Sequence, residues 1–100
     1  MRTAVLCAAL LALPAWADNL LVVREGNDMI RLADDRCQSE QVLQRLPVEL
    51  HAHYRSATAV LQGVRFSACW RRHGSAAHIV YEDGDQGVIP MANLKPELMA

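Results

Sequence analysis

The segment SATAVLQGVRFSACWRRHGSAAHIVYEDGDQGVIPMANLK, residues Ser56–Lys95, decides the fold. Apolar and polar residues alternate within it between pairs of turn-forming residues, which is typical of antiparallel strands. We read four strands, joined by two tight hairpins and one looser turn between the hairpins. The first hairpin turns at Gln62 and Gly63, because a two-residue loop that contains glycine matches the twist of paired strands.

That turn determines which residues of the first hairpin share a face, because strand side chains alternate between the two sides of a sheet. The pairs predicted on the core face are Leu61 with Val64, Ala59 with Phe66, Ala57 with Ala68 and Arg55 with Trp70. The opposite face receives the half-polar pairs Val60 with Arg65, Thr58 with Ser67 and Ser56 with Cys69. The core is therefore expected to take Val64, Phe66 and Trp70.

The second hairpin is predicted over Ile79–Pro90, with the turn DGDQG. Asp83 and Gly84 stand where a positive φ or a local side-chain hydrogen bond is needed. Both faces of this hairpin are apolar. One is expected to carry Ile79, Tyr81 and Val88, and the other Val80 and Ile89. Pro90 lacks a backbone donor and indicates a sheet edge or a strand end.

Residues 1–17, MRTAVLCAALLALPAWA, have the pattern of a secretory signal peptide: Arg2, an apolar run and a small residue at each of positions 15 and 17. The apolar run is about half as long as a membrane-spanning helix, so a retained anchor is the weaker alternative. Cleavage after Ala17 leaves residues 18–100 as one small domain. We expect it in the periplasm or outside the cell, without a stable membrane anchor.

The charge balance argues against a nucleic-acid partner. The chain has 10 Lys and Arg against 11 Asp and Glu, and loss of Arg2 with the signal peptide makes the remainder more acidic. Arg71 and Arg72 form an isolated basic pair, too small to follow a phosphate backbone.

The cysteines predict one covalent bond. Cys7 leaves with the signal peptide, so Cys37 and Cys69 have only each other as partners in an oxidising compartment. A domain of this size hides only about 60 % of its surface on folding, and a disulfide compensates for that small core. The alternative is two unrelated buried thiols.

Two further elements are expected before the main segment. Leu20–Glu25 and Asp28–Leu32, separated by Gly26 and Asn27, predict a short hairpin. A helix capped by Asp34 or Asp35 should follow, with its apolar positions on one face at Leu43, Leu46 and Leu50. Pro47 either kinks that helix or restarts it, and we favour a restart.

Together these elements predict an α+β domain: a strongly bent antiparallel meander of about five or six strands, with one short helix across the face of Cys69. The sequences ACWRR, IVYEDGD, GVIP and NLKPE, together with Cys37, resemble a group of small exported bacterial proteins, some of them prophage-encoded, that carry no assigned function. The resemblance covers most of residues 18–100. It implies an exported, disulfide-stapled domain and no activity.

A looser likeness is to SH3-like and Tudor-like barrels, in which a strand ending in aromatic residues precedes another strand, a DG turn and a short turn bearing a leucine. The helical insertion and the export signal depart from that pattern. The ligands of those domains are therefore not carried over to this chain.

No catalytic, cofactor or metal motif is present. His51, His53, His73 and His78 lack the spacing of a zinc site, and both remaining cysteines are needed for the disulfide. The acidic cluster around Gly84 lacks the length and the distal glutamate of a calcium loop. No serine lies in a nucleophile elbow.

We therefore expect a non-enzymatic exported interaction module whose partner is an envelope protein or ligand. The alternative is a small metal-binding protein or enzyme of the cell envelope. Trp70 and Tyr81 follow the core register, which leaves charged residues for a partner. The candidate partner-binding residues are Arg71, Arg72, Glu82, Asp83 and Asp85.

Overall fold

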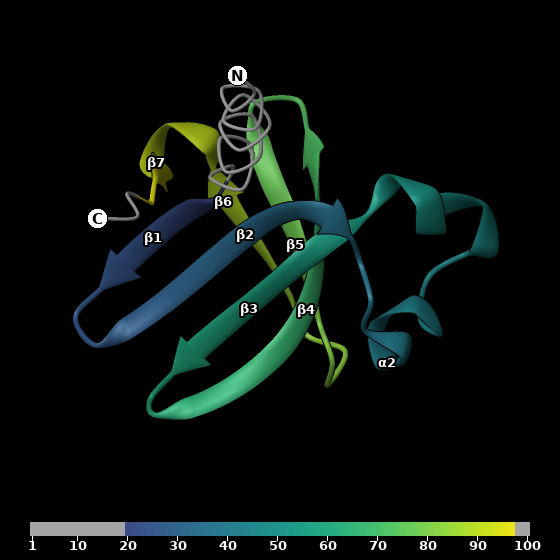
Figure 1. The fold of residues 1–100 in the computed structure, drawn as a ribbon, viewed down its shortest axis with the longest axis horizontal. Coiled ribbons are helices and arrows are strands. Elements are labelled where there is room, and N and C mark those ends of the chain that lie inside the picture. The colour runs from purple at the N-terminus through teal and green to yellow at the C-terminus, as the bar shows by residue number, and fades with distance from the viewer. Residues whose placement is uncertain (1–19, 98–100) are drawn as a thin grey trace, which may run out of the picture.

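Seven antiparallel strands form one sheet that curls into a half-barrel in the computed structural model (Figure 1). The structure describes residues 20–97; the predicted signal peptide and its cleavage site lie outside them. The strands are β1 (Leu21–Glu25), β2 (Asp28–Arg36), β3 (Arg55–Leu61), β4 (Val64–His73), β5 (Ala76–Tyr81), β6 (Gln86–Pro90) and β7 (Lys95–Pro96). Their order across the sheet is β6-β5-β4-β3-β2-β1-β7, so only β7 departs from a meander.

The strand count exceeds the prediction because of β7. This strand has two residues, one of them a proline, and its sequence carries no alternation to reveal it. It pairs with β1 at Leu21 and Val22. The 3-10 turn η3 (Met91–Asn93) carries the chain from β6, at one edge of the sheet, to β7 at the other. The sheet must therefore curl enough for its two edges to approach each other.

The first hairpin has the predicted register, from Leu61 opposite Val64 to Arg55 opposite Trp70. Gln62 and Gly63 form its two-residue turn with φ values of 53° and 82°. Trp70 is buried as expected, but Val64 is 53 % exposed, so its assignment to the core is wrong. Val64 lies next to the turn, beyond the part of the sheet that its neighbours cover.

The other turns also follow local chemistry. Gly26 has a φ of 62° and lies in the turn of the predicted N-terminal hairpin, which is confirmed. The connection expected to be loose is instead a tight turn at Gly74 and Ser75. Gly84 has a φ of 94°, and the Asp83 carboxylate accepts a hydrogen bond from the Asp85 N–H at 3.0 Å, as predicted for this turn.

The predicted faces of the second hairpin are wrong. Ala77 pairs with Ile89 and His78 pairs with Val88, so Ile89 shares the face of Ile79, and Val88 is 66 % exposed on the other. The Tyr81 N–H donates to the Asp85 carbonyl at 2.8 Å, so these two residues pair and three residues lie between them in the turn. A change of one residue in the turn exchanges the two faces of the returning strand.

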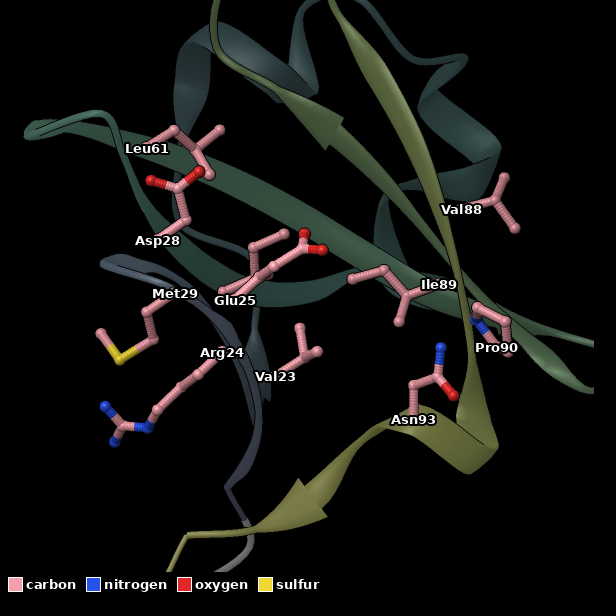
Figure 2. A pocket seen from close by; sticks show the side chains of 11 residues that line it. Val23, Arg24, Glu25, Asp28, Met29, Leu61, Val88, Ile89, Pro90 and Asn93 are labelled. Atoms are coloured by element: carbon pink, nitrogen blue, oxygen red, sulfur yellow. The ribbon is translucent and has the colours of Figure 1, made fainter.

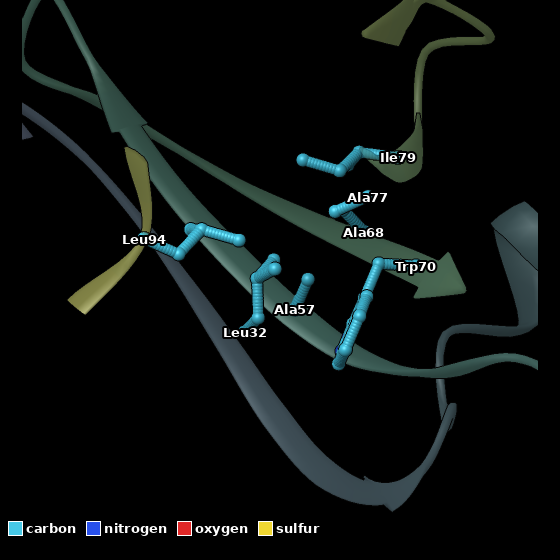
Figure 3. Close-up of a cluster of buried hydrophobic side chains, with 7 residues drawn as sticks. All are labelled: Leu32, Ala57, Ala68, Trp70, Ala77, Ile79 and Leu94. Atoms are coloured by element: carbon cyan, nitrogen blue, oxygen red, sulfur yellow. The ribbon is translucent and has the colours of Figure 1, made fainter. Parts of the chain in front are cut away.

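The main core fills the concave side of the half-barrel (Figure 3). Leu32 and Ile79 are completely buried there, and Leu94, which follows η3, reaches them from the far edge. The remaining buried members are Ala57, Ala68, Trp70 and Ala77. Three alanines among seven residues keep this side thin, which allows the sheet to bend sharply.

An irregularity in β2 supplies the hydrogen-bond acceptor for the indole N–H of Trp70. The β2–β3 register shifts between Leu32 and Arg36. The carbonyl of Ala33 in this stretch accepts a hydrogen bond from Trp70 Nε1 at 2.8 Å. Because a buried indole N–H without a partner is costly, the bulge and the burial of Trp70 support each other.

The predicted helix start at Asp34 or Asp35 is wrong. Strand β2 continues through Arg36, and the helix is the single turn α2 (Glu40–Leu43), whose cap Ser39 accepts a hydrogen bond from the Val42 N–H. Strand pairing with β3 extends β2 past these aspartates despite their preference for caps. A 3-10 segment, η2 (Val48–His53), begins after Pro47, in agreement with the predicted restart.

A second apolar cluster lies on the outer face of the sheet. It consists of Cys37, Val42, Tyr54, Cys69 and Val80. The Cys37–Cys69 disulfide confirms the predicted pairing and joins the start of the helical segment to β4, with 5.4 Å between the two Cα atoms. Figure 1 shows α2 and η2 beside the sheet. Over residues 20–97, we find no helix with the length and apolar character needed to cross a membrane.

Candidate functional site

The half-barrel is open between β6 and β1, and we call this opening the seam. Within the described part of the chain, β6 pairs only with β5. Strand β7 covers β1 only at Leu21 and Val22, so the outer edge of β1 is unpaired from Val23 to Glu25. Unpaired strand edges present backbone groups that are ready to accept another strand.

The hydrogen-bond pattern identifies the free groups of β6. Tyr81 donates to the Asp85 carbonyl, and Met91 donates to the Ser75 carbonyl at 2.9 Å. Hydrogen-bonded pairs alternate along antiparallel strands. The odd-numbered residues of β6 therefore bond to β5, whereas Gln86 and Val88 direct N–H and C=O toward the seam.

A groove of about 250 Å³ lies in the seam (Figure 2). Its apolar lining consists of Val23, Met29, Ile30, Leu61, Val88, Ile89 and Pro90. Figure 2 shows Val23 and Ile89 pointing into the space between the two strands, whereas Val88 points away. Since Val23, Ile30 and Ile89 also pack against the main core, the floor of the groove is continuous with that core.

The mouth of the groove is acidic. Glu25 and Asp28 face each other across the β1–β2 hairpin, and both line the groove. Asp28 accepts a hydrogen bond from the Gln62 N–H at 2.8 Å, which ties the two hairpin tips together. Arg24 also lines the groove, but its guanidinium lies 3.6 Å from the Glu97 carboxylate. The two carboxylates therefore dominate the charge at the mouth.

The five predicted partner-binding residues fall into two separate groups. Arg71 and Arg72 lie on β4 opposite His78 and Ala77. The acidic residues are in the β5–β6 turn, and a strand rises roughly 17 Å over the five residues from Ala77 to the start of that turn. The structure therefore does not bring the five residues together in one site.

Two of the three acidic residues in the turn have structural contacts. The Glu82 carboxylate accepts a hydrogen bond from the Ser67 N–H at 2.6 Å, and Asp83 holds the turn itself. Burial, followed by the charges of Asp85 and Asp83, raises the pKa of Tyr81 above its usual value. Its phenol stays protonated at neutral pH and packs edge-on against Phe66, with 6.4 Å between ring centroids.

The histidines are dispersed. His51 Nε2 lies 3.0 Å from the Leu46 carbonyl, and His78 Nε2 lies 2.8 Å from the Gln86 side-chain oxygen. Among residues 20–97, no three His, Cys, Asp or Glu side chains are grouped so that they could hold a metal ion.

The sequence pattern did not point to the groove residues. The only available signal was the pair of acidic residues, Glu25 and Asp28, around the first turn, which turn chemistry alone explains. The predicted register of the second hairpin places Ile89 on the wrong face, away from Val23. The chain matches no family model, no curated protein and no solved structure.

Proposed function

We propose that this protein is a non-enzymatic exported binding module that takes an extended polypeptide segment into the seam groove. One observation carries the proposal: two unpaired strand edges, on β1 and β6, flank an apolar groove. An added strand gains main-chain hydrogen bonds from an exposed edge, and alternate side chains enter the pockets beside it. Such an occupant would complete the half-barrel.

The residues of the groove also indicate the length and the side chains of the polypeptide segment that would bind there. Strand β6 has five residues, which matches a short extended segment of about the same length. Apolar side chains at alternate positions would contact Ile30 and Ile89. A lysine or arginine near one end would face Glu25 and Asp28, because a complementary charge is favoured at the rim of an interface.

Two sequence features support an exported location. Residues 1–17 have the composition of a signal peptide, and the Cys37–Cys69 disulfide suits an oxidising compartment. For the metal-binding alternative, residues 20–97 contain no group of three His, Cys, Asp or Glu side chains that could hold a metal ion.

Binding should be tested with the exported protein and a library of synthetic peptides in which apolar residues alternate with polar ones and one end carries lysine. Val88→Pro removes an N–H that faces the seam. Val88 is one of the residues at the groove, but its side chain points away from the space between the two strands in Figure 2. We expect the substitution to weaken binding of the selected peptides by about 1 kcal/mol, roughly fivefold in Kd. Val48→Pro is the matched control, because Val48 is 74 % exposed in η2 and follows its N-cap, where proline is tolerated.

Charge reversal provides an independent test. Glu25→Lys should weaken binding of lysine-bearing peptides and reduce the salt dependence of association, since rim charges act mainly on the association rate. Glu49→Lys, on exposed η2, is the control. Unchanged binding by both Val88→Pro and Glu25→Lys would exclude the seam as the binding site.

A further inference from the structure

One end of the seam groove is closed by the chain itself, and we call it the closed end. After Pro90, η3 crosses the seam, and β7 then pairs with β1 at Leu21 and Val22. Figure 2 shows this connection running below the space between Val23 and Pro90, with Asn93 on it. An extended segment that lies along β6 therefore cannot continue past Asn93, so the closed end fits a chain terminus.

Three contacts hold the connection in place. Leu94, which follows η3, is buried in the main core, and the Met91 N–H donates to a carbonyl of the β4–β5 turn at 2.9 Å. Beyond β7, the Glu97 carboxylate accepts hydrogen bonds from Arg31 Nε and Nη2 at 2.7 and 2.8 Å. Because the chain is held on both sides of Asn93, the connection forms a fixed wall of the groove.

The closed end carries positive charge, in contrast to the acidic mouth. Asn93 lines the groove and also a neighbouring recess that contains Arg24, Lys95 and Glu97. Arg31 and Arg24 already share the Glu97 carboxylate. Lys95 is exposed and has no carboxylate within ion-pair distance among residues 20–97. The Asn93 side chain forms no hydrogen bond within the same part of the chain. A free amide and an uncompensated ammonium group thus share the recess at this end.

On the basis of the proposed function, we propose that the seam groove takes the C-terminal end of a partner polypeptide, with the terminal α-carboxylate at Asn93 and Lys95. A carboxylate is favoured there because the Asn93 amide can donate a hydrogen bond and the Lys95 ammonium group supplies the opposite charge. An α-amino group at the closed end would instead meet an uncompensated cation.

This polarity determines how the rest of the segment lies. Strand β1 runs from the closed end to the mouth, so the segment is antiparallel to β1 and parallel to β6. The unpaired edge of β1 spans Val23 to Glu25. The last residue of the segment would lie opposite Val23, and the residue two positions earlier would lie opposite Glu25 on the same face. We therefore expect an apolar last residue and a lysine or arginine two positions before it.

Calorimetric titration of the exported protein with synthetic peptides tests the proposal. The tightest-binding library peptide that has lysine two positions before an apolar last residue is prepared in three forms: with a free carboxylate, with a C-terminal amide, and with three further residues. All forms are acetylated at the N-terminus. We expect the amide and the extended form to bind at least about tenfold more weakly than the free acid. The amide loses a charge-assisted hydrogen bond, and the extended form meets η3.

Asn93→Asp places a carboxylate at the closed end, so it should weaken binding of the free acid at least about tenfold and leave the amide unaffected. Lys95→Gln should reduce the preference for the free acid in the same direction. Gln38→Glu is the matched control, because it makes the same charge change at an exposed position outside the groove. Equal affinities of the three peptide forms, in peptides that Val88→Pro and Glu25→Lys still weaken, would overturn the C-terminal polarity alone. Absence of peptide binding, or binding that neither seam variant weakens, would overturn the proposed function as well.

Discussion

Removal of the Cys37–Cys69 disulfide should cost a large part of the stability of this domain. The bridge joins residues separated by 32 positions. In the chain-entropy model, closing a loop of that length stabilises the folded state by about 3.7 kcal/mol at 25 °C. Both sulfur atoms lie in the outer apolar cluster, so their replacement by alanine also leaves small voids beside Val42 and Val80. We expect a total loss of about 4 to 5 kcal/mol for Cys37→Ala/Cys69→Ala.

Thermal unfolding followed by circular dichroism measures this loss. For a domain of this size, about 1 kcal/mol shifts the Tm by 4–8 °C, so the double variant should melt roughly 20 °C or more below the oxidised wild type. Reduced wild type is the control, because it loses the cross-link but keeps both sulfur atoms. It should lie between the two forms and closer to the double variant.

The structure also predicts where order is lost. Residues 37–54 are attached to the sheet by the disulfide and by the outer cluster, and the hydrogen bond from the Cys37 N–H to the Tyr54 carbonyl at 3.1 Å joins the two ends of the segment. Amide exchange should therefore accelerate in this segment before it does so in β3 and β4. A double variant that melts within a few degrees of wild type, or native exported protein with two alkylatable thiols, would refute the reasoning.

Three further predictions concern the core, the acid response and processing. Leu32→Ala should reduce the urea unfolding free energy by about 2 to 5 kcal/mol, because Leu32 is completely buried in the main core; a loss below 1 kcal/mol would contradict that packing. A hydrogen bond from Arg31 lowers the pKa of Glu97, and the charges of Arg31 and Arg24 lower it further. The resulting stability is present above pH 4.5, the ordinary value, and is lost as the pH falls through the lowered pKa, so Glu97→Gln should flatten the acid limb of the pH–stability curve. Mass spectrometry of the exported protein should find Asp18 as the first residue, and an intact residue 1–17 segment in membranes would contradict cleavage.

The sequence alone was sufficient for two kinds of feature: those that depend on residues close together in the chain, and those for which only a few arrangements are possible. The turn at Gln62 and Gly63 specified the register of the first hairpin, because a two-residue turn and one buried face leave a single pairing. The disulfide followed from counting, since the predicted removal of residues 1–17 leaves only two cysteines. The burial of Trp70 followed from the same register.

Other features needed the tertiary structure. Asp34 and Asp35 favour a helix cap locally, but pairing with β3 places them in the extended part of β2. The face of Ile89 depends on one residue of turn length, which the acidic DGDQG segment does not specify. In both cases several local solutions have similar free energies, and contacts with distant strands select one of them.

The seam groove arises from the way the sheet curls. The seam groove exists because the curvature brings β6 opposite β1, so that residues from the two ends of the described chain form one apolar floor. Alternation and turn chemistry determine which residues are neighbours within a hairpin. The relative position of two sheet edges depends instead on the summed twist of all the strands between them, and only the complete fold specifies it.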